Sequence, residues 1–286
     1  RRGPRLFELR AGATLAPATL SPTTMGQLRR LLFPALPKVF LSRACGGACA
    51  LPLPRWARSP VYGWFARRYG ASLDEMDGEL SGFRSMQDFF RRPLRAGARP
   101  IASAPLVWPC DGRVVGIGSV ANGRIEQIKG RDYALADLLG DEQLAAALDG
   151  GEQATIYLAP GDYHRVHAPF AGEVERVEKL RGTLFPVNPS AVRTIDRLFV
   201  RNSRHVFHCR LASGQRAAVV MVGAYNVGDT HVTVGGGAIT NGQEIGRFGF
   251  GSTVVVVLPR EAPRFRRLPA ETRVRVGEAA DGAAGS

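Results

Sequence analysis

The sequence predicts an α+β protein in which helices precede an antiparallel β core, arranged as a sandwich or a partly closed barrel. Two observations predict this class. From about residue 106 onward, short segments rich in Val and Ile are separated by Gly, Pro or Asn, and several alternate in polarity. Before about residue 100, the chain instead has the pattern of short helices that prolines interrupt.

The strand pattern recurs throughout the second part of the chain. One helical interruption is predicted at residues 135–148, and the rest of residues 101–286 forms the β-rich domain. Eight segments carry the strand pattern: GRVVGIGSV, ATIYLA, GEVERVEKL, RLFV, HVFHCRL, AAVVMVGAY, STVVVVL and TRVRVG.

A helix is predicted at residues 72–96. Ser72 with Glu75 has the spacing of a capping box, in which each side chain bonds the other residue's backbone amide. Ser85 with Asp88 forms a weaker version of the same signal. Residues 26–70 predict one or two further short helices, separated by a proline-rich loop.

The positive charge is concentrated at the N-terminus. Residues 1–70 hold twelve Lys or Arg and one acidic residue, whereas the whole chain has a formal net charge of +13. Large apolar residues, including Trp56 and Trp64, lie among these basic residues. The mixture favours helices that associate with an anionic membrane surface, and we therefore predict a membrane-docking region at residues 25–100. A helical pair packed on the body of the protein is the alternative.

Other features limit the class of protein. No run of 18 apolar residues exists, which favours peripheral attachment over a spanning helix. No nucleic-acid motif accompanies the basic residues, so nucleic acid is not an expected partner. Residues 1–24 predict a disordered leader, whose Arg-rich composition fits either a mitochondrial transit peptide or a stretch upstream of a true start at Met25.

The cysteines and histidines do not predict a metal site. Four scattered cysteines are too few for a secreted domain built on disulfides. Two histidine pairs have HxxH spacing, His164 with His167 and His205 with His208, but neither has an evident third ligand. Residues three apart on a strand also face opposite sides, which argues against the second pair. We therefore expect no bound metal.

The segment GRFGFGST at residues 246–253 is the most unusual motif. It is not a phosphate-binding loop, because Ser252 stands where that motif requires Lys and a strand follows instead of a helix. It is not a nucleophile elbow either, because G-x-S-x-G is absent. Taken alone, the segment predicts a glycine-rich hairpin turn.

Together with DYHRVHAPFAG, however, GRFGFGST resembles the paired signature of the phosphatidylserine decarboxylases. In that family a Gly–Ser bond within L-G-S-T is cleaved to make a pyruvoyl group. Phe250 replaces the Leu here, RNSRHV near Ser203 replaces RNERV, and the stretch 228–246 is shorter than in many members. Further blocks resemble the family in the same order: LPKVFLSR, FARRYGASLDEM, FFRRPLRAGARPI, PCDGRVVGIG, IEQIKGRDYALADLLG, LFPVNPSAV and VGAYNVG.

The resemblance implies a proenzyme that cuts itself between Gly251 and Ser252 and converts Ser252 into a covalent pyruvoyl cofactor. Such an enzyme decarboxylates phosphatidylserine to phosphatidylethanolamine and CO2. The implied partners are phosphatidylserine in an anionic membrane, the large and small chains of one precursor, and further copies in a homo-oligomer. The implied location is the cytoplasmic face of a bacterial cell membrane, with the mitochondrial inner membrane as the alternative.

The resemblance also implies roles for individual residues. Ser252 attacks the Gly251 carbonyl, His167 acts as its base, and Asp111 orients that histidine, as in a Ser-His-Asp triad. His164 then protonates the carbon left after CO2 departs. Pyridoxal phosphate fits less well, because the chain has only three lysines and no evident phosphate cup.

Three other functions remain open at this stage. A related pyruvoyl enzyme could decarboxylate a soluble amino acid. A serine hydrolase could use Asp111, His167 and Ser252 without cutting its own chain. A membrane-binding β domain could have no catalytic activity.

Overall fold

The computed structural model describes residues 49–282, except residues 129, 225–229 and 250–251. These residues belong to a single compact unit, Lys38–Ser286. The leader predicted at residues 1–24 and the first part of the predicted membrane-docking region lie outside the described residues. Within the described ranges, no helix is both long enough and apolar enough to cross a membrane.

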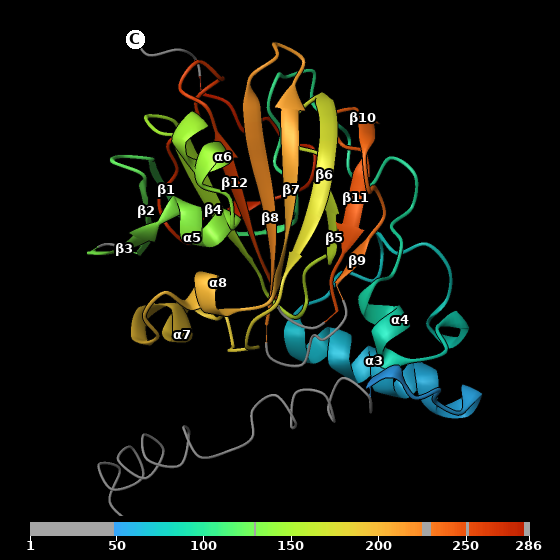
Figure 1. Ribbon diagram of the computed structural model, residues 1–286. Helices are drawn as coiled ribbons and strands as arrows, with labels where there is room; N and C mark the ends of the chain where they lie inside the picture. The colour runs from blue at the N-terminus through green and yellow to red at the C-terminus, as the bar shows by residue number, and fades with distance from the viewer. Residues whose placement is uncertain (1–48, 129, 225–229, 250–251, 283–286) are drawn as a thin grey trace, which may run out of the picture. The chain divides into compact units, whose positions relative to one another are not determined.

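The largest element is an antiparallel sheet of eight strands in the order β10-β6-β7-β8-β12-β4-β1-β13 (Figure 1). β12 lies inside the sheet, paired to β8 on one side and to β4 on the other. The strands span β1 Gly112–Ser119, β4 Glu152–Leu158, β6 Gly172–Leu180, β7 Arg204–Leu211, β8 Arg216–Gly223, β10 Gly237–Ile239, β12 Ser252–Leu258 and β13 Arg273–Val274.

Two smaller sheets complete the β structure. One has the order β5-β11-β9 and the other is the hairpin β2-β3. Their strands span β2 Arg124–Ile128, β3 Arg131–Ala134, β5 Arg165–His167, β9 His231–Val232 and β11 Glu244–Arg247.

Both faces of β12 are buried, which explains its apolar run. All seven residues of this strand are buried. Val254 and Val256 face a core that includes Val166 of β5 and Ile245 of β11. The alternate residues of β12 face a second core, which the short helices and the β2-β3 hairpin cover. β-branched residues suit a strand in this position because they pack closely on both faces of the pleat.

The helices over the second core are short. They span α5 Leu135–Leu139, α6 Glu142–Ala147, α7 Pro189–Thr194 and α8 Leu198–Arg201. The predicted helix at residues 135–148 is divided into α5 and α6, because Gly140 adopts a left-handed conformation that ends α5. The predicted strand RLFV is wrong: its residues form most of α8, which packs on the sheet through Leu198 and Phe199.

Within residues 55–90, three helical segments precede the sheet: α3 Arg55–Tyr69, the single 3-10 turn η1 Leu80–Gly82 and α4 Met86–Phe90. They share an aromatic core, in which the rings of Tyr62 and Phe89 stack with centroids 4.9 Å apart. Figure 1 shows α3 and α4 near the end of the large sheet at which β12 begins.

The predicted helix at residues 72–96 is wrong in extent. Gly78 has a φ of +86°, which interrupts any helix before η1. The capping box at Ser72 therefore starts no helix, whereas the weaker signal at Ser85 does form one. Ser85 Oγ accepts a hydrogen bond from the Asp88 amide, and the Asp88 carboxylate accepts one from the Ser85 amide.

The α+β class with a large antiparallel sheet is confirmed. β10 and β13 lie at the two edges of the large sheet, so its described strands do not close into a barrel. The domain boundary predicted at residue 100 stays a prediction.

Candidate active site

Ser252 is the first residue of β12 and is held from both sides. Its neighbours across the sheet are Leu158 of β4 and Gly223 of β8. The side chain is fully buried, and its hydroxyl oxygen has no hydrogen-bond partner in the described structure. A buried polar group without a partner is costly and rare, so it draws attention to the site. Gly251, on the other side of the predicted cleavage point, lies outside the described residues.

The alternation along β12 fixes the direction in which Ser252 points. Val254 and Val256 contribute to the core that also contains Val166 and Phe248. Residues two apart on a strand point to the same face. The Ser252 side chain therefore faces the small sheet that contains β5 and β11.

His164 directly precedes β5. Pairing between β11 and β5 continues beyond β5, because the Phe248 amide donates a hydrogen bond of 2.9 Å to the His164 carbonyl. The side chain is fully buried and lies against the ring of Phe90.

The hydrogen bonds of His164 fix its tautomer. Its Nδ1 lies 2.8 Å from the Asp162 carbonyl oxygen and must donate, since a carbonyl can only accept. Nε2 then carries the lone pair, and it is buried without a partner. Burial lowers the pKa of His164 to about 3, with Arg92 lowering it further and the Asp162 carbonyl opposing the shift. At neutral pH His164 is therefore an uncharged base with a free nitrogen.

His167 has similar chemistry. It follows Val166 on β5, and its ring packs beside that of Tyr163. Its Nδ1 donates to the Gly242 carbonyl at 2.7 Å, and its buried Nε2 has no partner. Burial lowers the pKa of His167, an effect that the Gly242 carbonyl opposes.

No hydrogen bond joins Asp111 to His167 among the described residues, although the Asp111 charge is near enough to raise the pKa of His167, and the triad stays a prediction. The position beside Nδ1 of His167 belongs to the carbonyl of Gly242. The Asp111 carboxylate instead binds the guanidinium of Arg99, with an Arg99 Nη2 to Asp111 Oδ2 distance of 2.5 Å. It also accepts a hydrogen bond of 2.9 Å from the Val276 amide. Asp111 thus links the residues before β1 to the segment after β13.

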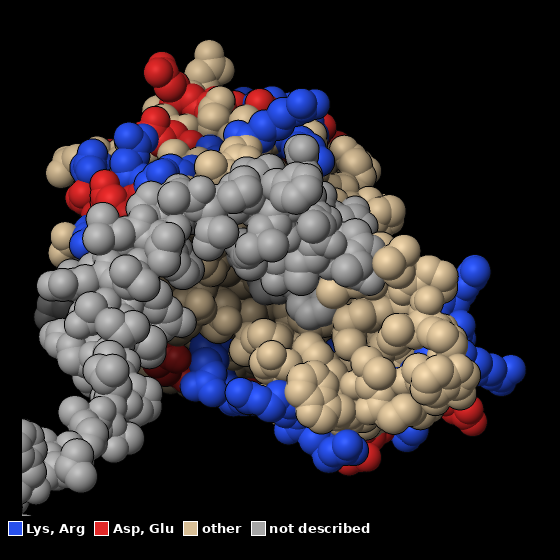
Figure 2. All heavy atoms as spheres, turned by 90° about the horizontal axis from the view of Figure 1, so that it is seen from below, with Lys and Arg blue, Asp and Glu red and all other residues tan. Residues whose placement is uncertain are grey.

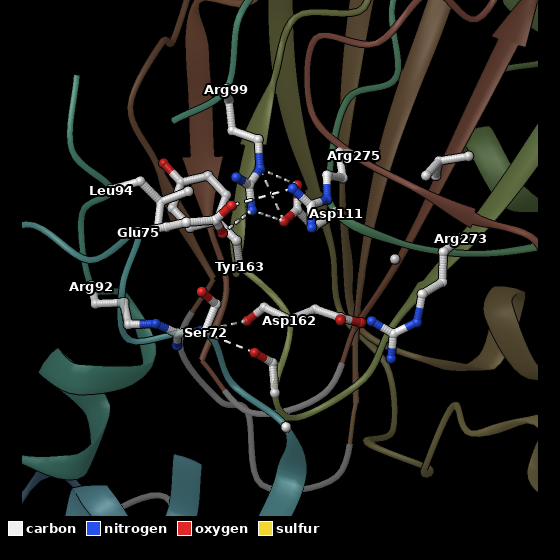
Figure 3. Close-up of a pocket in the computed structure, with 14 residues that line it drawn as sticks. Ser72, Glu75, Arg92, Leu94, Arg99, Asp111, Asp162, Tyr163, Arg273 and Arg275 are labelled. Carbon is white, nitrogen blue, oxygen red and sulfur yellow. Dashed lines mark hydrogen bonds and ion pairs between the residues drawn. The ribbon is translucent and has the colours of Figure 1, made fainter. Parts of the chain in front are cut away.

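A small pocket of about 110 Å³ adjoins these residues, and the sequence analysis did not predict it (Figure 3). Charged side chains dominate its lining, among them Glu75, Arg92, Arg99 and Asp162. Arg92 and Arg99 lie within the block FFRRPLRAGARPI, which the sequence resemblance included without assigning a role to any residue. Each of these arginines directly precedes a proline, Pro93 or Pro100, but this pattern does not show that the two side chains line one pocket.

The fold and the site define a class: a protein with a large antiparallel sheet, a buried serine without a hydrogen-bond partner at the start of an inner strand, and two histidines whose Nε2 atoms are buried. A family model described as phosphatidylserine decarboxylase matches residues 86–280. This range contains Asp111, His164, His167 and Ser252, and the chain belongs to the phosphatidylserine decarboxylase family.

Similar curated proteins carry the name phosphatidylserine decarboxylase proenzyme. The one from Anaeromyxobacter sp. (strain K) is 43% identical over 272 residues, covering 87% of this chain and 96% of the relative. The one from Chromobacterium violaceum is 40% identical, covering 75% and 85%. The one from Halorhodospira halophila is 39% identical, covering 90% and 94%. These findings confirm the family, the enzyme class and the proenzyme character predicted from the sequence.

Proposed function

We propose that this chain cleaves itself between Gly251 and Ser252 and then decarboxylates phosphatidylserine to phosphatidylethanolamine and CO2. One observation carries the proposal: the hydroxyl of Ser252 is buried without a partner, and so are the Nε2 atoms of His164 and His167. A serine hydroxyl needs such a base before it can attack a carbonyl. The names of the related proteins support the substrate.

Self-cleavage uses the residues around the start of β12. Ser252 Oγ attacks the carbonyl carbon of Gly251 while a histidine takes the hydroxyl proton, and the peptide C–N bond breaks to leave an ester. Loss of a proton from Cα of Ser252 then breaks the Cβ–O bond, which frees the Gly251 carboxylate and leaves a dehydroalanine. Water converts this residue to a ketone and releases ammonia.

We propose that His167 is the base for self-cleavage, with the Asp111 charge near enough to raise its pKa, and that His164 makes the later proton transfer. The resemblance to the family supports this division of roles. Both imidazoles are neutral at pH 7, because burial lowers both pKa values.

The residues present fit a pyruvoyl cofactor derived from Ser252. When formed, a ketone at this position supplies an electron sink for the bond that releases CO2. Position 252 suits it, because hydrogen bonds from two neighbouring strands hold β12 and the side chain lies in a site shielded from water. The same pairing would keep the small chain, residues 252–286, bound to the large chain after cleavage, with β13 on β1 as a second attachment.

The described part of the N-terminal region supports peripheral membrane attachment, which we propose at the anionic cytoplasmic face of a bacterial cell membrane. Trp56 and Trp64 lie eight residues apart on α3 and are 81% and 57% exposed. Arg67 and Arg68 follow in the last turn of the helix. Figure 2, viewed from below the orientation of Figure 1, shows uncharged surface bordered by Lys and Arg. Exposed Trp beside Arg suits the headgroup layer of an anionic bilayer.

The end of α3 lies close to the site. A Cβ placed on Gly161 would be only 2.1 Å from the carbonyl oxygen of Tyr69, the last residue of α3. Gly161 in turn lies three residues before His164. Docking through α3 would therefore bring the membrane surface near the proposed reaction centre.

Vesicle binding tests the docking proposal. Exchanging Trp56 and Trp64 for Ser should reduce co-sedimentation with vesicles that contain phosphatidylserine, while Ile101→Ser, a change at another exposed apolar residue, should not. Equal binding by both variants would refute the role of α3.

Turnover tests the proposed function. We expect the purified chain to release CO2 from phosphatidylserine vesicles and to form phosphatidylethanolamine, with no release from free L-serine. Decarboxylation of free L-serine alone would favour the soluble amino acid as substrate. A full-length chain that hydrolyses esters without releasing CO2 would favour the serine hydrolase.

A further inference from the structure

The charged pocket beside the site contains more arginines than its carboxylates neutralise. Four arginines and three carboxylates line it: Arg92, Arg99, Arg273, Arg275, Glu75, Asp111 and Asp162. They come from six separate parts of the chain that converge next to the turn leading from β4 to His164. Figure 3 shows these side chains pointing towards one another across the pocket.

Two of the carboxylates are already paired. Arg99 binds Asp111 through Nε and Nη2, and its Nη2 also lies 3.0 Å from Oε2 of Glu75. Arg275 binds the other oxygen of Glu75 at 3.2 Å. Burial lowers the pKa of Arg99, but its hydrogen bonds to both carboxylates outweigh burial and raise it overall. This network is closed on itself and leaves no free carboxylate for the remaining cations.

Arg92 is the cation without a matching acid. It is 2% exposed, and its Nη2 donates to the carbonyl oxygens of Gly161 and Asp162 at 3.0 and 3.4 Å. Its Nε and Nη1 are buried and have no hydrogen-bond partner among the described residues. Leaving two donors of a buried guanidinium unsatisfied is unfavourable, and burial accordingly lowers the pKa of Arg92. An oxyanion in the pocket would satisfy these donors.

The third carboxylate does not fill this role. Asp162 Oδ2 accepts a hydrogen bond of 2.7 Å from the amide of Ala159. Burial raises the pKa of Asp162, and Arg273 is among the charges that oppose this shift. Tyr163 adds a neutral donor to the lining, because burial raises its pKa to about 12. The pocket therefore offers Arg92, Arg273 and a phenol to an incoming anion.

The pocket adjoins the proposed reaction centre. Gly161, Asp162 and Tyr163 of the lining lie between Leu158, which pairs with Ser252, and His164. Arg92 is also close enough to His164 to lower its pKa. At about 110 Å³ the pocket is smaller than the roughly 300–1,000 Å³ of pockets that enclose a whole ligand. It suits one charged group of a larger substrate.

We propose that this pocket, through Arg92 and Arg273, binds the phosphodiester of the lipid headgroup while the reacting atoms lie at Ser252. The inference rests on the proposed function, since it names the part of the substrate that the pocket holds. Guanidinium groups recognise phosphate oxygens well because their donors form a planar fork. The substrate carboxylate is the poorer candidate. Binding it to arginine would stabilise the charge that must disappear as CO2 forms, which raises the barrier.

The phosphodiester is unchanged by the reaction, so binding it stabilises the ground state and the transition state alike. Loss of the interaction should raise KM and leave kcat nearly unchanged. We expect Arg92→Lys, which keeps the charge and loses the fork, and Arg273→Gln each to raise KM for phosphatidylserine about tenfold. Arg266→Gln removes an equivalent charge from the small chain outside the pocket and should leave KM at the wild-type value.

A binding measurement makes the test independent of turnover. The Ser252→Ala precursor retains the pocket, and isothermal titration should detect binding of glycerophospho-L-serine but not of L-serine. Inorganic phosphate should compete with glycerophospho-L-serine. In this background Arg92→Lys and Arg273→Gln should each weaken binding about tenfold, and Arg266→Gln should not. If the Arg92 variant fails to fold, Arg273→Gln decides the outcome.

Two results would overturn the proposal. One is unchanged binding and unchanged KM in folded Arg92→Lys and Arg273→Gln. The other is phosphate that binds without displacing glycerophospho-L-serine, which would indicate an anion site separate from the substrate. A wild-type chain that stays uncut and inactive would instead refute the proposed function, and the titration of the precursor would still report on the pocket.

Discussion

The two ends of β12 differ sharply in chemistry. At the first end, strand register aligns Ser252 with Leu158 and Gly223, and the charged pocket lies beside it. At the second end, Leu258 lines a larger pocket of about 320 Å³, whose lining contains no titratable side chain. The larger and more apolar pocket is the usual first candidate for a binding site. Here the reactive groups lie at the other end, so pocket size alone would have led to the wrong place.

The difference follows from what each end buries. The Ser252 end buries polar groups that lack partners, including Ser252 Oγ, His164 Nε2 and two donors of Arg92. Such groups lower stability unless a reaction or a ligand uses them. The Leu258 end buries mainly apolar side chains, which stabilise the fold, and the buried Glu152 opposite Leu258 is paired with Arg264 and Arg267. We therefore expect changes at the first end to affect activity and changes at the second to affect stability.

The largest effect is expected for Ser252→Ala. Without the hydroxyl, no attack on Gly251 is possible, so the chain should stay intact and decarboxylation should fall below detection. Stability should not decrease, because the change removes a buried hydroxyl that has no partner. Gel electrophoresis and thermal melting measure both. A cleaved Ser252→Ala chain would contradict the account.

The next effect separates the two histidines. In His164→Asn, the Asn side chain can still donate to the Asp162 carbonyl, but the free ring nitrogen is lost. This variant should still be cleaved and should lose decarboxylation. In His167→Asn, self-cleavage should slow by about 10²–10⁴-fold, the usual contribution of a general base. A time course on gels, followed by a CO2 assay, compares them. Slow cleavage in His164→Asn with normal cleavage in His167→Asn would show that the two roles are exchanged.

At the other end of β12, Leu258→Ala should affect stability instead. Leu258 is 2% exposed, and truncating a buried leucine costs about 2–5 kcal/mol in free energy of unfolding. Cleavage before residue 252 should proceed normally at temperatures where the variant is folded. Denaturant unfolding and gel analysis of the same sample measure the two quantities. Failed cleavage in a folded Leu258→Ala chain would show that the two ends are coupled.

The smallest effect concerns pH. The folded pKa of His164 is lowered to about 3, below the value of about 6.5 for an unfolded histidine. Below about pH 6.5, the unfolded chain therefore binds a proton that the folded chain does not, and the free energy of unfolding falls. His164 contributes up to about 1.4 kcal/mol per pH unit to this loss.

The uncleaved background isolates that contribution. Ser252→Ala and the double variant with His164→Asn should both be unfolded by denaturant at pH 7 and at pH 5. The double variant should lose less stability between these values, although the other buried histidines still contribute. Equal losses in the two proteins would show that His164 is not buried in its neutral form.

Local signals in the sequence predicted much of the fold. The run of valines in β12 identified a strand, and the structure shows that both of its faces are buried. Ser85 and Asp88 identified the start of α4. The predictions failed where glycines broke a helical pattern at Gly78 and Gly140, since the pattern does not show which glycines adopt positive φ.

The site was only partly predictable. Ser252, His164 and His167 were found through a motif resemblance, and the structure supplied their orientations. The partner of Asp111 could not be read from the sequence, because Arg99 lies in an irregular segment with no periodicity. The role of Arg92 could not be predicted for a related reason. Two of its buried nitrogen donors lack hydrogen-bond partners, and only the packing around the side chain shows this.

The central claim is that the chain cuts itself at Ser252, and the mass of the purified protein under denaturing conditions tests it most directly. The account predicts two chains, residues 1–251 and 252–286, with a combined mass close to the 30.8 kDa of the whole. The shorter chain should resist N-terminal sequencing and should react with a hydrazine, as a ketone does. A single chain of full mass, or a shorter chain that begins with an ordinary serine, would contradict it.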